Sequence, residues 1–352
     1  MSARAFVTGG NGQDGWYLIE LLLSRGYVVH AHARRPPRAD EHQGKVVWYD
    51  GELTDPAYLS KTLHAAKADE IYNLAAISRP SVSWTMPVET TALNAVVPQL
   101  ICEFIARNSP ECRLFQASSS DMFDNTTASQ NELTSLRPST PYGIAKAFAH
   151  RMIGAYRERD NLHLSCGIMF NHESPRRPLA FVSQKIAHAA AAIALGINET
   201  TELDERGLPI VQDGMLRLGD IEVRRDFGFA GDFVEAIHAI VRSPEPDDFV
   251  IGTGESHSIA EFCERAFAAV GLDWRAHVST DAALVRKADS RYTEADASRL
   301  RTKLGWRPKV GFESLVRMMV ESRLALLKSQ RDAAQEAASG HQSARCSSDR
   351  SV

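Results

Sequence analysis

The chain has 352 residues, of which 44% are hydrophobic and 24% are charged, and its formal net charge is −4. This length suffices for a full hydrophobic core and predicts two lobes. Scattered basic residues argue against a nucleic-acid or membrane partner, and no apolar run approaches the roughly 18 residues that span a bilayer. Five well-separated cysteines and no room for a signal peptide before the first predicted strand indicate a cytoplasmic protein without a zinc site.

The first half of the chain alternates between strand and helix signals. Short apolar or β-branched runs predict the strands, and apolar side chains at helical spacing predict the helices. Strands are expected at residues 3–8, 27–33, 70–76, 113–118 and 162–168, and helices at residues 16–25, 57–66 and 94–107. This alternation predicts a Rossmann-type, doubly wound α/β fold. Such a fold binds its ligands at the carboxyl ends of the parallel strands.

Beyond residue 177 the pattern is interrupted, which predicts a smaller, discontinuous α/β lobe. Helices are expected at residues 181–195, 231–242 and 258–270, a strand at residues 248–251, and a polar surface excursion at residues 198–214. We assign residues 1–171 plus about 222–254 to the Rossmann domain. Residues about 172–221 plus 255–330 form the second lobe. Residues 331–352 lack an apolar face and are expected to be a disordered tail.

A glycine-rich turn follows the first predicted strand. Gly9, Gly12 and Gly15 give the spacing G-x-x-G-x-x-G directly before a predicted helix. Such a turn lets the backbone approach a pyrophosphate at a helix N-terminus, where free N–H groups favour an anion. The alternative is an ordinary glycine-rich turn, but the strand–turn–helix context favours a dinucleotide site.

Two arginines follow the second predicted strand. Arg34 and Arg35 stand where an NAD-binding chain carries an acidic residue for the ribose. Guanidinium groups suit the 2′-phosphate of NADP, which makes the first domain an expected NADP-binding domain. The alternative is a solvated basic turn.

A serine, a tyrosine and a lysine suggest hydride-transfer chemistry on a sugar hydroxyl. Tyr142 and Lys146 are spaced i, i+4 and share one helix face, while Ser119 ends a predicted strand. A nearby ammonium lowers the pKa of a phenol, so Tyr142 is the expected base. Asp121 adds a carboxylate that could remove a second proton, which separates elimination of water from oxidation or epimerisation. Chance spacing is the alternative for an isolated Y-x-x-x-K.

These motifs resemble the extended short-chain dehydrogenase/reductase superfamily and, more closely, the GDP-mannose 4,6-dehydratase family. The resemblance runs from about residue 3 to about residue 325 and is most specific in Phe170-Asn-His-Glu-Ser-Pro-Arg-Arg177. Its other segments are residues 8–15, 73–76, 116–120, 141–146, 225–228, 232–236, 246–251 and 304–308.

The resemblance implies a redox-neutral elimination that yields a GDP-4-keto-6-deoxy sugar. Tyr142 would take the O4 proton while the C4 hydride passes to NADP. A carboxylate then removes the acidified C5 proton, the C6 hydroxyl leaves as water, and the hydride returns to C6. Asp121 stands where the family has a glutamate base and Ser119 where it has Thr or Ser. The family also implies a homodimer or homotetramer.

The predicted site residues fall into three groups, and no metal ligand is expected. The catalytic residues are Ser119, Asp121, Tyr142 and Lys146. The NADP-binding residues are Gly9, Asn11, Gly12, Gln13, Asp14, Gly15, Arg34, Arg35, Glu52, Leu53, Leu74, Ala75, Ala76, Tyr142, Lys146, His172 and Arg177. The residues expected to bind GDP-mannose or a related nucleotide sugar are Ser78, Ser83, Ser119, Asn171, Lys185, Leu218, Arg225 and Arg286.

Several departures from the family pattern, at Asp121, Asp124, Glu52, residues 77–80 and residues 198–214, leave the sugar nucleotide open. Asp121 is one methylene shorter than glutamate, and residues 198–214 are longer than the family predicts. A related GDP-sugar such as a GDP-heptose is therefore an alternative substrate. An NADP-dependent epimerase or reductase, for which Asp121 is dispensable, is the alternative enzyme. A non-catalytic NADP-binding sensor is the third hypothesis.

Overall fold

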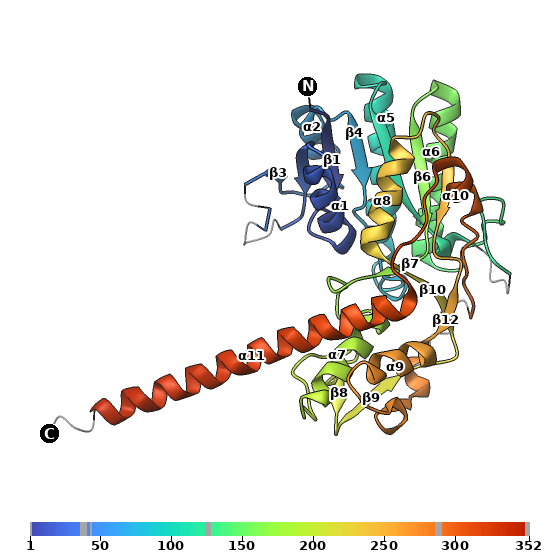
Figure 1. Ribbon diagram of the computed structural model, residues 1–352. Helices are drawn as coiled ribbons and strands as arrows, with labels where there is room; N and C mark the ends of the chain where they lie inside the picture. The colour runs from blue at the N-terminus through green and yellow to red at the C-terminus, as the bar shows by residue number, and fades with distance from the viewer. Residues whose placement is uncertain (1, 36–40, 43, 124–127, 286–290, 349–352) are drawn as a thin grey trace. The chain divides into compact units, whose positions relative to one another are not determined.

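The computed structural model describes residues 2–35, 41–42, 44–123, 128–285 and 291–348 (Figure 1). The chain divides into two compact units. Unit 1 comprises Met1–Glu173, Val223–His257 and Lys287–Gly311, and unit 2 comprises Ser174–Glu222, Ser258–Arg286 and Phe312–Val352. Each unit is assembled from three separate stretches of the chain.

Unit 1 is built on a seven-stranded parallel sheet with the order β3-β2-β1-β4-β5-β6-β11. The order reverses between β1 and β4, which is the place where doubly wound sheets bind ligands. The fold class predicted from the sequence is therefore confirmed. The strands are β1 (Arg4–Thr8), β2 (Val28–His32), β3 (Val46–Tyr49), β4 (Glu70–Asn73), β5 (Arg113–Ser119), β6 (Leu164–Met169) and β11 (Asp248–Ile251).

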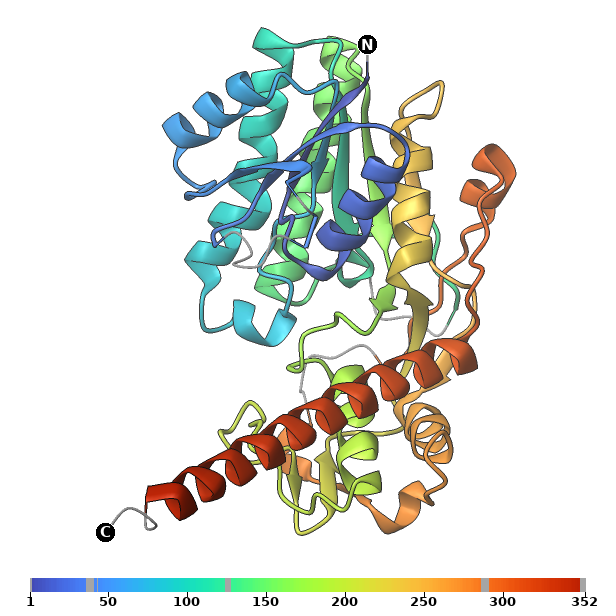
Figure 2. The ribbon, with the colours of Figure 1, turned by 60° about the vertical axis from the view of Figure 1, so that its left-hand side comes forward.

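Helices cover both faces of this sheet (Figures 1 and 2). On one face lie α1 (Gln13–Ser24) and α8 (Ala230–Val241), and on the other lie α2 (Pro56–Ala66), α5 (Val97–Asn108) and α6 (Pro141–Asp160). Successive strand residues point to opposite faces, so Leu114 packs in one core and Phe115 in the other. Burial on both faces explains why these strands are continuous apolar runs in the sequence.

The remaining elements of unit 1 are short helices, the helix α10 that packs against β11, and a second sheet of order β12-β10-β7. They are α3 (Pro80–Ser83), α4 (Pro87–Thr91), η1 (Ala92–Val96), η2 (Ser120–Met122), β7 (Asn171–Glu173), β10 (Arg224–Phe229), β12 (Ser256–Ser258, whose last residue belongs to unit 2) and α10 (Ser298–Leu304).

The described residues from 291 to 311 belong to unit 1, which corrects the predicted assignment of residues 255–330 to the second lobe. Leu300 and Trp306 are buried in the same core cluster as Phe233. The Trp306 indole also donates a 3.0 Å hydrogen bond to the carbonyl oxygen of Asp232. The sequence missed this return because α10 is short and the decisive contacts are distant along the chain.

Unit 2 packs α7 (Val182–Ala194) against α9 (Ile259–Ala268) and α11 (Phe312–Ser348). The middle of α7 is fully buried and rich in alanine, whose small side chains allow the neighbouring helices to pack closely. A small sheet, β13-β9-β8, completes the unit with β8 (Val211–Gln212), β9 (Met215–Leu218) and β13 (Val278–Thr280). The short helices η3 (Trp274–Ala276) and η4 (Ala282–Leu284) flank β13. Residues 198–214 are only partly the expected surface excursion, because Ile210 and Val211 are buried.

The prediction of a disordered tail over residues 331–352 is wrong for residues 331–348, which are helical as part of α11. This stretch is rich in Ala, which is the strongest helix former. It also extends an existing helix, so it needs no new nucleus. The lack of an apolar face in the sequence bears on whether a segment is buried, and it does not prevent that segment from forming a helix. Within the described parts of the chain, no helix has both the length and the apolar character needed to cross a membrane.

Candidate active site

The glycine-rich turn between β1 and α1 has the shape that a dinucleotide phosphate requires. Gly9 has φ +71°, and a Cβ there would lie 3.0 Å from the amide nitrogen of Ala75. A Cβ on Gly15 would overlap the carbonyl oxygen of Gly9. Gly12 is the N-cap of α1 and supplies no side-chain acceptor to the first N–H groups. The turn thus presents backbone N–H groups at a helix N-terminus, which fits an anionic pyrophosphate.

Three residues that are predicted to bind the cofactor contact one another beside this turn. The Gln13 amide donates to the carbonyl oxygen of His172 at 3.0 Å, and the His172 ring lies 2.9 Å from a carboxylate oxygen of Asp14. The other ring nitrogen lies 2.7 Å from the carbonyl oxygen of Phe170, and the ring stacks on Phe233 at 4.8 Å. These contacts fix the start of α1 against β7.

The turn is also tied to the segment that follows β2. The Asn11 amide donates to the carbonyl oxygen of Arg35 at 3.0 Å, and both Arg34 and Arg35 are exposed. Glu52 is exposed as well, whereas the side chain of Leu53 is buried in the core. A contact of Leu53 with a cofactor would therefore come from its backbone.

The loop after β4 is held beside Gly9 by two buried polar side chains. The Thr8 hydroxyl accepts hydrogen bonds from the amides of Leu74 and Ala75, both at 3.0 Å. Asn94 pairs with both backbone groups of Ile77, at 2.9 and 3.0 Å. Ala76 is half-buried and Ser78 is exposed in this loop. Asn94 was not predicted as a site residue, because its position inside a helical pattern gives no sign of a loop anchor.

The four predicted catalytic residues lie together at the carboxyl end of β5. The buried Ser119 hydroxyl accepts a hydrogen bond from the amide of Asp121 at 3.2 Å, and Asp121 is exposed in η2. The Lys146 ammonium donates to the carbonyl oxygen of Ala117 at 2.8 Å and lies 5.9 Å from the Tyr142 ring centroid. Burial lowers the pKa of Lys146 to about 8, although Cys166 and Asp14 act in the opposite direction.

The first turn of α6, which carries Tyr142, is anchored from two sides. The amide of Tyr142 donates to the Ser83 hydroxyl at 3.1 Å, and the amide of Gly143 donates to the N-cap hydroxyl of Thr140 at 3.0 Å. Ser83 is fully buried and donates in turn to the carbonyl oxygen of Pro80 at 2.6 Å. Ser83, predicted to bind substrate, is thus engaged with the helix of the predicted base.

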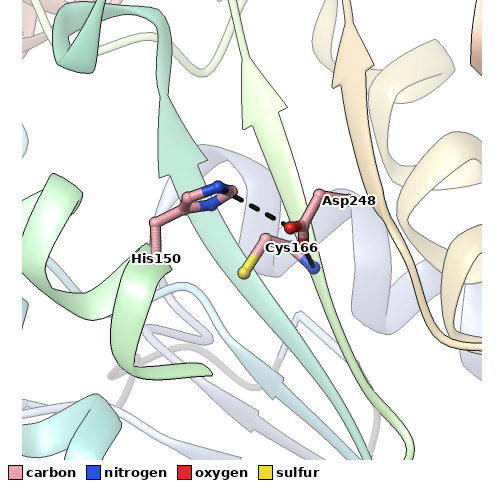
Figure 3. Close-up of side chains that lie close together, drawn as sticks. All are labelled: His150, Cys166 and Asp248. Carbon is pink, nitrogen blue, oxygen red and sulfur yellow. Dashed lines mark hydrogen bonds and ion pairs between the residues drawn. The ribbon is translucent and has the colours of Figure 1, made fainter. Parts of the chain in front are cut away.

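Three side chains with metal-ligating atoms, from α6, β6 and β11, lie close together (Figure 3). The ligand atoms of His150, Cys166 and Asp248 lie within 4.8 Å of one another. The Asp248 carboxylate already accepts two hydrogen bonds from the Arg157 guanidinium, at 2.8 and 2.9 Å. Burial raises the pKa of the Cys166 thiol, so a thiolate ligand is disfavoured. We interpret the cluster as an ion-pair network that joins α6 to β6 and β11.

The remaining predicted ligand-binding residues are divided between the units. Asn171 on β7 and Arg225 on β10 belong to unit 1, and the Arg225 guanidinium donates to the carbonyl oxygen of Arg224 at 2.8 Å. In unit 2, Lys185 lies on α7, Leu218 is buried on β9, and the Arg177 guanidinium lies 3.5 Å from the Phe181 ring centroid. Arg286 lies outside the described residues.

Two features define an extended short-chain dehydrogenase/reductase. One is the doubly wound sheet with a glycine-rich turn after its first strand, and the other is the set of Ser119, Tyr142 and Lys146 at one strand end. Within that class, the chain belongs to the GDP-mannose 4,6 dehydratase family, whose model matches residues 6–319.

Relatives from plants, animals and bacteria share this similarity. The chain is 38% identical to GDP-mannose 4,6 dehydratase 1 of Arabidopsis thaliana, over 92% of this chain and 90% of the plant protein. It is 34% identical to GDP-mannose 4,6 dehydratase of Homo sapiens, with 92% of each chain covered. It is 32% identical to GDP-mannose 4,6-dehydratase of Sinorhizobium fredii (strain HH103), over 93% of this chain and 98% of the bacterial protein.

Solved structures with similar folds are more distant in sequence. A UDP-glucose 4-epimerase from Thermotoga maritima with UDP-glucose has a TM-score of 0.78 at 20% identity, over 92% of this chain and 99% of the epimerase. The RMD protein of Pseudomonas aeruginosa, complexed with NADPH, has a TM-score of 0.75 at 20% identity, with the same coverage. These likenesses show the shared fold.

Proposed function

We propose that the protein is a nucleotide-sugar 4,6-dehydratase, a hydro-lyase, that converts GDP-mannose or a closely related GDP-sugar to the 4-keto-6-deoxy product. Family membership over nearly the whole chain supports a GDP-sugar dehydratase. The observation that carries the proposal is the position of Asp121, whose backbone lies directly against the first turn of the Tyr142 helix. An epimerase needs no carboxylate at this position.

We propose NADP as the cofactor, held by the turn of Gly9, Gly12 and Gly15 and by the exposed Arg34 and Arg35. Bound there, NADP would supply the acceptor for the hydride of the sugar and its later donor. The two guanidinium groups follow β2, where the ribose is bound in this fold, and they can pair with a 2′-phosphate. Gln13, Asp14 and His172 would support the site by keeping the start of α1 in place.

In this proposal the protein moves two protons at adjacent sugar carbons. Tyr142 removes the C4 hydroxyl proton, and Ser119 hydrogen-bonds that oxygen. Lys146, when protonated, stabilises the phenolate of Tyr142. The resulting ketone acidifies C5, and Asp121 removes the C5 proton. Protonation of the departing C6 hydroxyl by Asp121 then releases water. After the hydride has returned to C6, a proton drawn from solvent is added at C5, and Tyr142 gives up the proton taken from the C4 hydroxyl to solvent, which completes the 4-keto-6-deoxy product.

The residues that would bind the nucleotide sugar remain part of the proposal. We assign the sugar and diphosphate to Ser78, Asn171, Lys185, Leu218, Arg225 and Arg286, and the remaining cofactor contacts to Glu52, Leu53, Leu74, Ala75, Ala76 and Arg177. Ser83 would act through the first turn of α6, because its hydroxyl already accepts from the amide of Tyr142.

We also propose a homo-oligomer in a reducing, cytoplasmic compartment. Ile144 and Phe148 on α6 are 56% and 45% exposed, and Val96 in the adjacent η1 is 44% exposed, which leaves an apolar surface typical of a subunit contact. Cys102, Cys112, Cys166 and Cys263 are buried and unpaired. Light scattering should show a dimer or tetramer for the wild type and smaller species for Phe148→Glu; a monomeric wild type would contradict the oligomer.

The dehydratase proposal is tested by incubating the purified protein with GDP-mannose and NADP and following the mass of the nucleotide sugar. We expect loss of one water with no net formation of NADPH. An unchanged mass across a panel of GDP-sugars and UDP-sugars would overturn the proposal. Inversion at C4 without loss of water would support the epimerase.

A further inference from the structure

Lys185 and Glu205 form an ion pair within unit 2. Lys185 lies on α7, and its side chain is only 11% exposed, whereas the Glu205 side chain is 44% exposed. Burial alone would raise the pKa of Glu205, but hydrogen bonds from Lys185 and the backbone outweigh it and lower that pKa overall. Glu205 is therefore an anion at neutral pH.

The turn that carries Glu205 is fixed in place by its own hydrogen bonds. The Asp204 carboxylate accepts from the amides of Arg206 at 2.8 Å and Leu208 at 3.0 Å. The amide of Asp204 donates to the carbonyl oxygen of Leu208 at 2.7 Å, and Gly207 supplies the positive φ of +77° that the turn requires. The Arg206 guanidinium donates to Asp281 at 2.7 Å, which ties the turn to the segment after β13.

Further charged side chains line the pocket beside the pair. Lys185 lines a pocket of unit 2 together with Arg206 and Arg217 and the apolar side chains of Ile210 and Leu216. Asp204 lines this pocket as well, where it is ion-paired with Arg206. An ammonium has three donors and no acceptor, so its strongest partners are carboxylates and phosphates. Glu205 supplies such a partner from the protein itself, on the segment that is longer than the family pattern predicts.

We propose that Glu205 is an affinity-determining residue that occupies, on Lys185, the position of a phosphate group of the nucleotide diphosphate. This inference rests on the proposed function, because that function assigns Lys185 to the nucleotide sugar. Binding of the diphosphate breaks the Lys185–Glu205 pair or brings a second anion beside it. Either event costs affinity, so the segment of residues 198–214 weakens nucleotide binding in this chain.

Calorimetric titration with GDP, without turnover, tests the inference. Glu205→Gln removes the charge and should tighten GDP binding about 10-fold, the effect of one charge-assisted hydrogen bond. Glu199→Gln removes the same charge from an exposed position of the same segment and should leave GDP binding unchanged. Lys185→Met should weaken binding, and adding Glu205→Gln to it should bring no further gain.

Unchanged or weaker GDP binding in Glu205→Gln would overturn the inference, as would equal tightening by Glu199→Gln or the absence of GDP binding in every variant. Thermal unfolding of each variant confirms that the fold is intact. The proposed function is measured separately by loss of water from GDP-mannose. Tighter GDP binding without water loss would sink the function alone, and water loss without tighter binding would sink this inference alone.

Discussion

A Cβ atom on Gly143 would overlap the carbonyl oxygen of Asp121, so the first turn of α6 and the short helix η2 are in direct backbone contact. This contact sets the spacing between the proposed C5 base and the neighbouring Tyr142. Asp121 and Gly143, which are 22 positions apart in sequence, are thereby fixed relative to each other by their backbones. The absence of a side chain at Gly143 is what permits the arrangement.

Gly143→Ala should separate the proposed base from Tyr142 and reduce kcat. The added methyl group forces η2 and α6 apart, and a misplacement of about 1 Å can cost on the order of 100-fold in rate. Gly154→Ala on the same helix is the matched control, because its Cβ would lie 3.7 Å from the nearest atom, a guanidinium nitrogen of Arg157. The control should keep full activity and gain up to about 1 kcal/mol in unfolding free energy. Steady-state kinetics and thermal unfolding measure both effects, and wild-type kcat in Gly143→Ala would contradict the prediction.

Ser83→Ala should lower kcat about 10-fold. It leaves the amide of Tyr142 without its 3.1 Å acceptor in a fully buried position, at a cost of about 1–3 kcal/mol in stability. We expect kcat to fall more than KM rises, because the hydroxyl acts on the position of Tyr142. Ser81→Ala, at an exposed position of the same short helix, should change neither value. A rise in KM alone would show that Ser83 acts only in substrate binding.

The activity should decline above about pH 8 because Lys146 loses its proton there. Burial lowers the pKa of Lys146 from its ordinary 10.5 to about 8, and only the cation stabilises the Tyr142 phenolate. The pH profile of kcat/KM reports groups of the free enzyme, so it should fall about 10-fold per unit above pH 8. A flat profile between pH 7 and 10 would exclude this assignment.

The same shift predicts a pH-dependent stability. Between about pH 8 and 10.5 the unfolded chain binds a proton that the folded chain has lost at Lys146. Lys146 therefore contributes stability that rises with pH in this window, whereas the buried thiols of Cys102, Cys112 and Cys263, whose pKa burial raises to about 12, contribute a fall. Lys146→Met should remove the Lys146 contribution alone, so the difference in unfolding free energy between wild type and variant should grow with pH, as measured by urea unfolding at several pH values. An identical pH dependence in the variant would contradict the assigned pKa.

Much of unit 1 could be predicted because its strands and helices are separated by strong local signals. The short run Val46–Tyr49 was not predicted as a strand, since four residues after a polar stretch carry little periodicity. The return of Leu300 and Trp306 to the first core was also missed, because it depends on contacts far along the chain.

The residues of the candidate site could be predicted from the sequence, but the hydrogen bonds that hold them in place could not. Motif spacing identified Ser119, Tyr142 and Lys146, yet the hydrogen bond from the amide of Tyr142 to Ser83 arises only when α3 and α6 meet. The Lys185–Glu205 pair likewise joins a helix to a turn 20 residues further along the chain, which no local pattern indicates.

The central claim is that Asp121 removes the C5 proton in an elimination of water. It is tested most directly by incubating the wild type and Asp121→Asn with GDP-mannose and NADP in D2O and analysing the product by mass spectrometry and NMR. We predict that the wild type releases one water and places deuterium at C5. Asp121→Asn should bind NADP normally and do neither. Water loss at the wild-type rate in Asp121→Asn would contradict the account.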